Sequence, residues 1–267
     1  MSGPPPDYVR SAFGVPSEIA QQFSGGRGEA YRCGPAVFKP VGDHAEASWL
    51  AGVVEHVSVP EIRLARPIRA SDGRWVVAGW CAHRYVTGHQ APRFADIIRV
   101  GELLHAGLAG VARPRFLAER ADLWSWADRV SWGELDDADP RLGDGVAAAA
   151  FRRVAAGRRP VSARAQLVHG DLTGNVLFAG SAPPAVIDLT PYWRPPVWST
   201  AVVVVDAIAW GGADLELAHR DDEDWLQLLR RALLFRLAVS LGHPDSTPAS
   251  MVGLLSAVEL LTPLLES

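Results

Sequence analysis

Short apolar runs separated by glycine, proline and aspartate fill the first third of the chain, which is typical of a small antiparallel sheet. The segment from Phe23 to Tyr31 predicts a strand, a glycine turn and a returning strand. Further strands are expected at residues 36–39, 61–68 and 75–80.

One helix is predicted within this sheet region, beginning after Asp43. Asp43 is a good N-cap residue, and Glu46 follows three positions later, as in a capping box. On a helical wheel of about 100° per residue, Glu46 lies at the centre of the apolar face, whereas Glu55 lies opposite and is expected to be solvated. Because an unpaired carboxylate on an apolar face is costly, Glu46 is expected to pair with a cation; the alternative is that it merely completes the capping box.

Helical periodicity replaces the strand pattern in the rest of the chain. Helices are predicted at residues 94–110, 116–132 and 140–157, with two more after Asp224. The change of pattern near Gly88 marks the predicted boundary between two lobes. The chain is therefore expected to be an α+β protein, with an N-terminal lobe of residues 1–88 and a mainly helical lobe of residues 89–267.

Two short apolar runs interrupt the helical region, and each delivers a carboxylate at its end. Residues 165–168 lead into His169-Gly170-Asp171, and residues 185–187 lead into Asp188. Asn175 lies between them and is followed by a further short strand. This arrangement predicts that polar side chains gather at strand ends.

The composition excludes several classes of protein. With 267 residues, 48% of them apolar, the chain can form a sizeable core, and its apolar runs are too short to cross a bilayer. The N-terminus lacks the basic start and apolar stretch of a secretory signal, so a cytoplasmic protein is expected. A net charge of −4, with scattered arginines, argues against nucleic-acid binding. The two cysteines, Cys33 and Cys81, predict neither a disulfide scaffold nor a zinc site.

Two residues are unusual because each occurs once. The sequence contains 26 lysines and arginines together, and Lys39 is the single lysine among them. Asn175 is likewise the single asparagine. A chain that uses arginine for almost every positive charge needs lysine where a compact ammonium group is required. Biased codon usage is the simpler alternative.

Phosphoryl transfer requires a flexible loop over the phosphates, a cation, oxygen ligands for magnesium and a carboxylate near the nucleophile. Gly25 and Gly26 would let the backbone approach phosphate closely, although glycines in a hairpin turn are often no more than a turn. Lys39 would reach the phosphates of ATP, and Glu46 would pair with it.

Asp171, Asn175 and Asp188 give the stronger signal. Mg²⁺ prefers oxygen ligands and is usually held by one or two protein groups together with substrate phosphates. Asp188 fits as the main magnesium ligand and the Asn175 amide oxygen as the second, which leaves Asp171 as the base that faces the acceptor hydroxyl. Turn or capping roles are the alternative for each aspartate alone.

The sequence resembles the aminoglycoside phosphotransferase and choline kinase branch of the protein-kinase-like fold. The resemblance rests on Ser24-Gly25-Gly26, Val37-Phe38-Lys39, His169-Gly170-Asp171, Asn175-Val176-Leu177 and Val186-Ile187-Asp188. It implies a bilobal fold, ATP and Mg²⁺ as cofactors, and a small-molecule acceptor. It also implies that Lys39 contacts phosphate, that Asp171 is catalytic, and that Asn175 and Asp188 bind magnesium.

The same resemblance implies supporting roles for other residues. His169 would brace the catalytic loop, Asp206 would support it from a helix, and adenine would lie near residues 82–85. The chain departs from the family in one spacing, because three residues instead of four separate Asp171 from Asn175. Gly174 is expected to let the shortened loop close.

Other functions remain open at this stage. A nucleotide-binding pseudokinase without turnover is the main alternative, because of the shortened loop. A protein kinase is disfavoured by His169-Gly170-Asp171 in place of His-Arg-Asp, and a dinucleotide-binding oxidoreductase lacks its third glycine. The acceptor and the oligomeric state are not predicted: acidic loops at residues 134–139 and 221–224, or an aromatic pocket with Trp193 and Trp198, would suit different acceptors.

Overall fold

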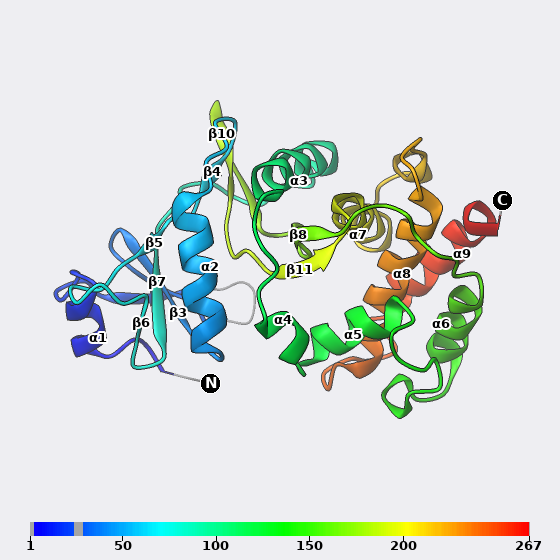
Figure 1. Cartoon of the computed structure of the whole chain (residues 1–267), viewed down its shortest axis with the longest axis horizontal. Helices are drawn as coiled ribbons and strands as arrows, with labels where there is room; N and C mark the ends of the chain where they lie inside the picture. The colour runs from blue at the N-terminus through cyan, green and yellow to red at the C-terminus, as the bar shows by residue number, and fades with distance from the viewer. Residues whose placement is uncertain (1–2, 24–28, 267) are drawn as a thin grey trace. The chain divides into compact units, whose positions relative to one another are not determined.

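A computed structural model describes residues 3–23 and 29–266 and divides the chain into two compact units (Figure 1). Unit 1 comprises Met1–Ala91 together with Asn175–Leu189, and unit 2 comprises Pro92–Gly174 together with Thr190–Ser267. The predicted α+β class is confirmed, since an antiparallel sheet forms the N-terminal part and helices dominate the C-terminal part. The predicted lobes differ from these units in the segment Asn175–Leu189, which joins unit 1 through strand pairing.

The main sheet of unit 1 has six strands in its described part, and all of its pairings are antiparallel. The order is β1-β2-β3-β7-β5, and β6 pairs with β7. The strands are β1 (Ala20–Gln22), β2 (Tyr31–Cys33), β3 (Ala36–Pro40), β5 (Pro67–Ile68), β6 (Val76–Val77) and β7 (Trp80–Arg84). The strand predicted at residues 36–39 is therefore present. The two strands predicted within Phe23–Tyr31 lie further out than expected, because β1 ends at Gln22 and β2 begins at Tyr31.

The prediction of one strand over residues 75–80 is wrong. Ala78 and Gly79 have φ values of 48° and 78°, and Val77 pairs with Trp80 across them. Two successive residues with positive φ form the tight turn that suits the twist of a hairpin. Trp80 therefore starts a new strand instead of ending one, and Ala-Gly is a weak sequence signal for such a turn.

The two faces of the main sheet have different environments. Along β3, Ala36 and Phe38 are fully buried, whereas Val37 and Lys39 point to the opposite face. The buried face packs against α1 (Asp7–Ala12), whose Val9 is fully buried. The core residues of this face are Val9, Phe13, Tyr31, Cys33, Ala36, Phe38, Ala70, Val77, Trp80 and Ala82. The hydrophobic effect thus leaves the Lys39 face available for polar groups.

The predicted helix after Asp43 is α2 (His44–His56). The Asp43 carboxylate accepts hydrogen bonds from the backbone N–H groups of Ala45 and Glu46, which confirms its role as N-cap. Glu46 is half-buried on this helix, and Glu55 is exposed, as predicted, where it forms a two-bond ion pair with Arg69.

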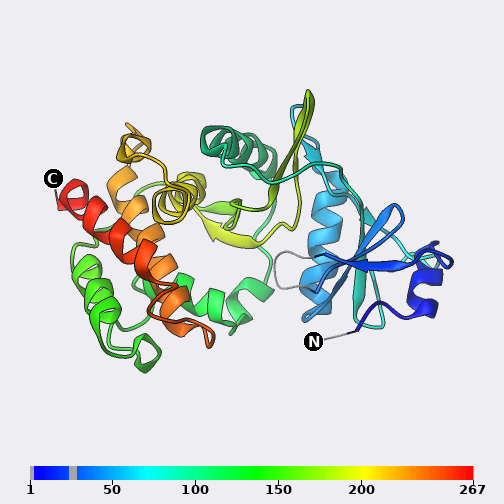
Figure 2. The ribbon, with the colours of Figure 1, turned by 180° about the vertical axis from the view of Figure 1, so that it is seen from behind.

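A second sheet of unit 1 joins segments that are distant in sequence. β10 (Ala182–Val186) pairs in parallel with β4 (Arg63–Leu64) and antiparallel with β9 (Val176–Ala179). Figures 1 and 2 show β10 beside β4. The single run predicted over residues 61–68 is therefore divided, because its first part joins this sheet and Pro67–Ile68 joins the main sheet.

Unit 2 is mainly helical. Its helices are α3 (Phe94–Leu108), α4 (Phe116–Glu119), α5 (Leu123–Ser131), η1 (Pro140–Leu142), α6 (Val146–Ala156), α7 (Pro196–Ala209), η2 (Leu215–Ala218), α8 (Trp225–Gly242) and α9 (Val252–Glu266). Two strands, β8 (Gln166–His169) and β11 (Pro191–Arg194), form an antiparallel pair. The predicted helices at 116–132 and 140–157 are each divided in two.

Helix α7 was not predicted from the apolar pattern. All residues from Trp198 to Ile208 are buried, and α7 packs against α3, α8 and α9. A helix that is buried on every side has no polar face, so its sequence lacks the helical period. The valines of residues 202–205 favour a strand by propensity, and burial against three helices overrides that preference.

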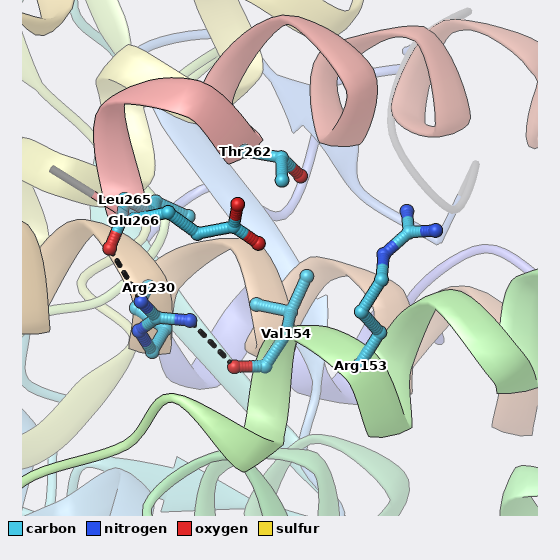
Figure 3. A pocket seen from close by; sticks show the side chains of 6 residues that line it. All are labelled: Arg153, Val154, Arg230, Thr262, Leu265 and Glu266. Atoms are coloured by element: carbon cyan, nitrogen blue, oxygen red, sulfur yellow. Dashed lines mark hydrogen bonds between the residues drawn. The ribbon is translucent and has the colours of Figure 1, made fainter.

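The C-terminal helix is attached to the rest of unit 2 by a buried arginine. Arg230 of α8 donates hydrogen bonds to the carbonyls of Val154, at 2.8 Å, and Leu265, at 2.6 Å (Figure 3). Figure 2 shows α9 lying along α8. The recess beside Arg230 has a volume of about 10 Å³, the space of roughly one water molecule. It is too small for a ligand, so Arg230 has a structural role here. Among the described helices, none has the length and apolar character that a membrane span requires.

Candidate active site

Lys39 lies on the polar face of the main sheet, next to the end of β10. Its backbone pairs with Cys81 across β3 and β7, and its ammonium Nζ lies 2.8 Å from Asp188 Oδ1. The Lys39 side chain is 25% exposed and that of Asp188 is 59% exposed. The structure thus brings the single lysine to one of the two predicted aspartates, in a pair that solvent can reach.

Asn175 and Asp188 lie at the same end of the β9–β10 hairpin. Val176, the residue after Asn175, pairs with Val186, and the Ile187 N–H donates a hydrogen bond of 2.9 Å to the Asn175 carbonyl. Asp188 follows directly. Strand pairing therefore makes neighbours of two residues that are thirteen positions apart in the sequence.

Asp188 has an unusual backbone conformation. Its φ is +52°, in the left-handed region that non-glycine residues seldom adopt. Such strain costs free energy, and it tends to occur at functional sites where the surroundings hold it in place. The conformation supports the interpretation that the position of this carboxylate matters.

The face that carries Lys39 also carries Cys81 and His83. Burial lowers the pKa of His83 to about 4, with a further lowering by Lys39, so its imidazole is neutral at pH 7. His83 Nδ1 is buried without a hydrogen-bond partner in the described part of the chain. Burial raises the pKa of Cys81 to about 11, which keeps the thiol protonated.

The oxygen ligands in unit 1 fit magnesium better than zinc. Within residues 3–23 and 29–266, no three His, Cys, Asp or Glu side chains lie close enough to hold a metal by themselves. One carboxylate and one amide oxygen, from Asp188 and Asn175, match the small protein contribution that Mg²⁺ takes when phosphates supply the remaining ligands. The donor set therefore fits a magnesium–nucleotide complex.

Asp171 follows β8 in unit 2, in a loop braced by His169. The His169 side chain is fully buried, and its Nδ1 accepts hydrogen bonds from the backbone N–H groups of Asp171, at 3.2 Å, and Thr190, at 3.4 Å. The backbone N–H of His169 in turn donates to His105 Nε2 at 3.0 Å. The predicted bracing role of His169 is confirmed.

His105 has to be neutral to accept that hydrogen bond. Burial, with a smaller contribution from His169, lowers the pKa of His105 to about 3. The side chain is 2% exposed on α3. The Asp171 loop therefore rests on two buried histidines.

Glycines close the loop on both sides of Asp171. A Cβ atom at Gly170 would lie 2.2 Å from the ring of Tyr192, which is buried on β11. Gly174 has φ +83°, a conformation that suits glycine, and it ends the three-residue link between Asp171 and Asn175. The expected role of Gly174 in closing the shortened loop agrees with this geometry.

A buried arginine connects Asp171 to Asp206. Arg236 of α8 donates to Asp206 Oδ1 through Nε at 2.7 Å and to Asp206 Oδ2 through Nη2 at 2.6 Å. The same Nη2 donates to Asp171 Oδ1 at 2.8 Å. Exposed fractions of the side chains are 11% for Arg236, 3% for Asp206 and 44% for Asp171.

The charges of this network stabilise one another. Burial raises the pKa of Asp206, and Arg236 opposes that effect. Burial alone would lower the pKa of Arg236, but Asp206 and then Asp171 outweigh burial and raise it. Sequence reasoning missed Arg236, although a charged residue between Phe235 and Leu237 is a signal for a buried partner.

The predicted site residues thus fall into two sets. Lys39, Asn175 and Asp188 meet in unit 1, and Asp171 lies in unit 2. Three residues separate Asp171 from Asn175, so their Cα atoms lie within about 14 Å of each other by chain length alone. Gly25 and Gly26 fall outside the described residues.

The roles of Glu46 and of the other site residues stay predictions. Glu46 is half-buried near the start of α2, and its pairing with Lys39 belongs to those predictions.

The aromatic pocket considered for the acceptor is not formed by Trp198. This side chain is fully buried and makes edge contacts with Trp132, Tyr192 and Phe235. It therefore belongs to the core of unit 2. Trp193 is half-buried on β11.

The acidic loops are engaged by arginines and backbone groups. Asp137 pairs with Arg158, and Asp139 pairs with Arg141. Asp224 accepts hydrogen bonds from the backbone N–H groups of residues 162 and 163. These carboxylates serve the fold, which weakens the case that the loops attract a cationic acceptor.

One family model matches the sequence over residues 42–235, and it describes the phosphotransferase enzyme family. In a comparison with curated proteins, the sequence gives no significant match.

Several solved structures superpose over almost the whole chain. An aminoglycoside phosphotransferase from Alicyclobacillus acidocaldarius subsp. acidocaldarius has a TM-score of 0.66 at 16% identity, covering 100% of this chain and 96% of that one. A spectinomycin phosphotransferase in complex with ADP and spectinomycin has a TM-score of 0.58 at 13% identity, with coverages of 96% and 92%. A microcompartment-associated aminopropanol kinase has a TM-score of 0.60 at 15% identity, with coverages of 97% and 95%. The predicted kinase-like fold is confirmed.

Proposed function

Because this chain belongs to the phosphotransferase enzyme family, we propose that it is a small-molecule kinase that uses ATP and Mg²⁺. The observation that carries the proposal is the meeting of Lys39, Asn175 and Asp188 in unit 1. One cation for phosphate and two oxygen ligands for magnesium are what a magnesium–nucleotide complex requires.

The Lys39–Asp188 pair is suited to opening when the nucleotide binds. Asp188 and Asn175 would hold Mg²⁺, which supplies a positive charge that neutralises the phosphates. Lys39 would then exchange the Asp188 carboxylate for phosphate oxygens. Solvent reaches both side chains, most of all Asp188, which keeps the cost of this exchange low, since a solvent-accessible ion pair contributes about 0–1 kcal/mol.

Asp171 is assigned as the base for the acceptor. As the acceptor oxygen forms a bond to the γ-phosphorus, the bond from that phosphorus to the bridging oxygen of ADP breaks. The acceptor O–H or N–H proton passes to the Asp171 carboxylate. The brace from His169 supports this role, because it fixes the backbone that carries the carboxylate.

The acceptor is proposed to be a hydroxyl or an amine of a small molecule. Its identity is left to experiment, since the acidic loops are engaged within unit 2 and Trp198 is buried. The alternative function, a nucleotide-binding protein without turnover, is favoured by the shortened link between Asp171 and Asn175.

A screen of small-molecule acceptors with labelled ATP and Mg²⁺ tests the proposal. We expect transfer to at least one acceptor, and we expect Asp171→Ala to abolish transfer while ATP binding persists. Equal turnover by Asp171→Ala would contradict the role of Asp171. Binding of ATP with magnesium but no transfer to any acceptor would favour the alternative without turnover.

A further inference from the structure

We propose that Arg236 is a positioning residue for Asp171, which it holds in one orientation by joining it to the buried Asp206. The inference rests on the proposed function, because it gives Asp171 the role of base. It adds a residue from α8, sixty-five positions after Asp171, to the residues that the reaction depends on.

The geometry assigns Arg236 two different tasks. Two nitrogens of the guanidinium bind both oxygens of Asp206, and this two-bond contact fixes the plane of the guanidinium. The Nη2 that completes this contact also binds Asp171 Oδ1. Asp171 is therefore hydrogen-bonded to a guanidinium that Asp206 of the buried helix α7 already holds in place.

Asp206 gives the guanidinium a firm support. It lies on α7, the helix that is buried on every side, and its side chain is 3% exposed. A carboxylate at such a position needs a cation, since an unpaired buried charge costs several kcal/mol. The attraction that keeps Arg236 in place is thus independent of Asp171.

Arg236 also reduces the repulsion between two neighbouring carboxylates. Asp171 and Asp206 both contact the same nitrogen, so they share one positive charge. Without a cation between them, two neighbouring carboxylates tend to share a proton, because their like charges repel. A base needs to be unprotonated before it accepts the acceptor proton, so the shared guanidinium serves the reaction as well as the fold.

A second buried pair in unit 2 provides a matched control. Arg194 binds Asp128 through two nitrogens, with side-chain exposures of 13% and 12%, and it also binds Glu134. Asp128 is not among the predicted site residues, and both residues changed in the control variant, Arg194 and Asp128, lie outside the acidic loops considered for the acceptor. If both arginines were merely structural, equivalent changes at both would have equivalent effects.

The test compares two double variants of the full chain, Arg236→Met/Asp206→Asn and Arg194→Met/Asp128→Asn. Each removes one buried charge pair without leaving an unpaired buried charge, which protects the fold. The readouts are kcat, the KM for ATP, magnesium-dependent ATP binding, melting temperature, and the crystallographic orientation of Asp171. Arg236→Lys is added because it keeps the charge but loses the fork.

We expect kcat to fall about 100-fold in Arg236→Met/Asp206→Asn, since a small misplacement of a reacting group can cost this much. The KM for ATP stays within about twofold, and Asp171 leaves its orientation in the crystal; Arg236→Lys recovers part of kcat. In the Arg194 variant, kcat and Asp171 are unchanged.

The proposal is overturned if Asp171 keeps its orientation in the Arg236→Met/Asp206→Asn variant. Equal losses of kcat in the two double variants would also overturn it, because they would indicate general destabilisation. If the wild-type chain transfers phosphate to no acceptor, the proposed function fails, and the orientation of Asp171 still decides whether Arg236 positions it.

Discussion

One ion pair in unit 1 and one in unit 2 differ in burial and in geometry. The Lys39–Asp188 pair of unit 1 is a single contact between side chains that are 25% and 59% exposed. The Arg236–Asp206 pair of unit 2 is a two-bond contact between side chains that are 11% and 3% exposed. An exposed pair can change partners at small cost, whereas a buried pair cannot.

The cation also differs between these two pairs. Lysine carries a compact ammonium on a flexible chain, and arginine carries a rigid fork that matches a carboxylate. The single lysine occurs in the pair that we expect to open, and arginines occupy the buried pairs of unit 2. In this comparison the flexible cation lies in the pair that we expect to open, and the rigid one lies in the pair that we expect to stay closed.

Removing Asp206 is expected to have the largest effect on stability. Asp206→Ala leaves Arg236 without its main partner, and breaking a buried pair in this way costs about 3–5 kcal/mol. Asp188→Asn, which tolerates the positive φ, should change stability by less than about 1 kcal/mol. Urea unfolding of both variants measures the difference, and similar losses would break the comparison between the units.

A methyl group at Gly170 should have the next largest effect on stability. Its Cβ would meet the buried Tyr192 ring, and overpacking of this kind costs about 1–3 kcal/mol. Gly52 of α2 has open space around its Cβ position, so Gly52→Ala should stabilise unit 1 by about 0.5–1 kcal/mol. Thermal unfolding of the two variants tests the opposite signs; stabilisation by Gly170→Ala would show that unit 2 is less tightly packed than described.

Acid should weaken the support of the Asp171 loop. His105 binds a proton near pH 6.5 in the unfolded chain but at about 3 in the folded protein. The contribution of neutral His105 to the free energy of unfolding is therefore complete above pH 6.5. It decreases as the pH falls, by about 2 kcal/mol between pH 7 and pH 5, because the unfolded chain binds a proton at His105 and the folded protein does not. Unfolding measurements at both pH values should show a smaller decrease in His105→Gln, and an equal decrease would contradict the assignment.

Replacing Lys39 should have the smallest effect on stability and a large one on activity. Lys39→Met removes a pair that solvent can reach and leaves the 59% exposed Asp188 hydrated, so the free energy of unfolding should change by less than about 1 kcal/mol. Phosphate transfer should fall by about 100-fold, the typical loss when one electrostatic contact to developing charge is removed. Steady-state kinetics and urea unfolding together test this separation; a large loss of stability would indicate a structural lysine.

Much of the local structure that carries the candidate site residues was predictable because its signals are local. A strand that ends in a carboxylate can be recognised from a few residues, and the ends of β8 and β10 agree with the prediction within about two residues, the usual uncertainty of such boundaries. The capping role of Asp43 was equally local. In each case one short segment contains both the pattern and the reason for it.

The missed features depend on distant partners. Arg236 binds residues 30 and 65 positions away, so no local spacing connects them. Helix α7 has no polar face because three helices cover it, and its valines favour a strand. The turn at Ala78-Gly79 depends on two positive φ values that the residue types do not demand. These three features therefore depend on tertiary contacts, and the local sequence does not predict them.

The attachment of Asn175–Leu189 to unit 1 has a consequence for biosynthesis. β4 pairs with β10, a strand that is translated more than a hundred residues later. Arg63 and Leu64 therefore leave the ribosome before their strand partner exists, and the β4-β10-β9 sheet cannot form during that interval. A fragment that stops at Ala91 would lack β10, so it should be less stable than unit 1 of the full chain.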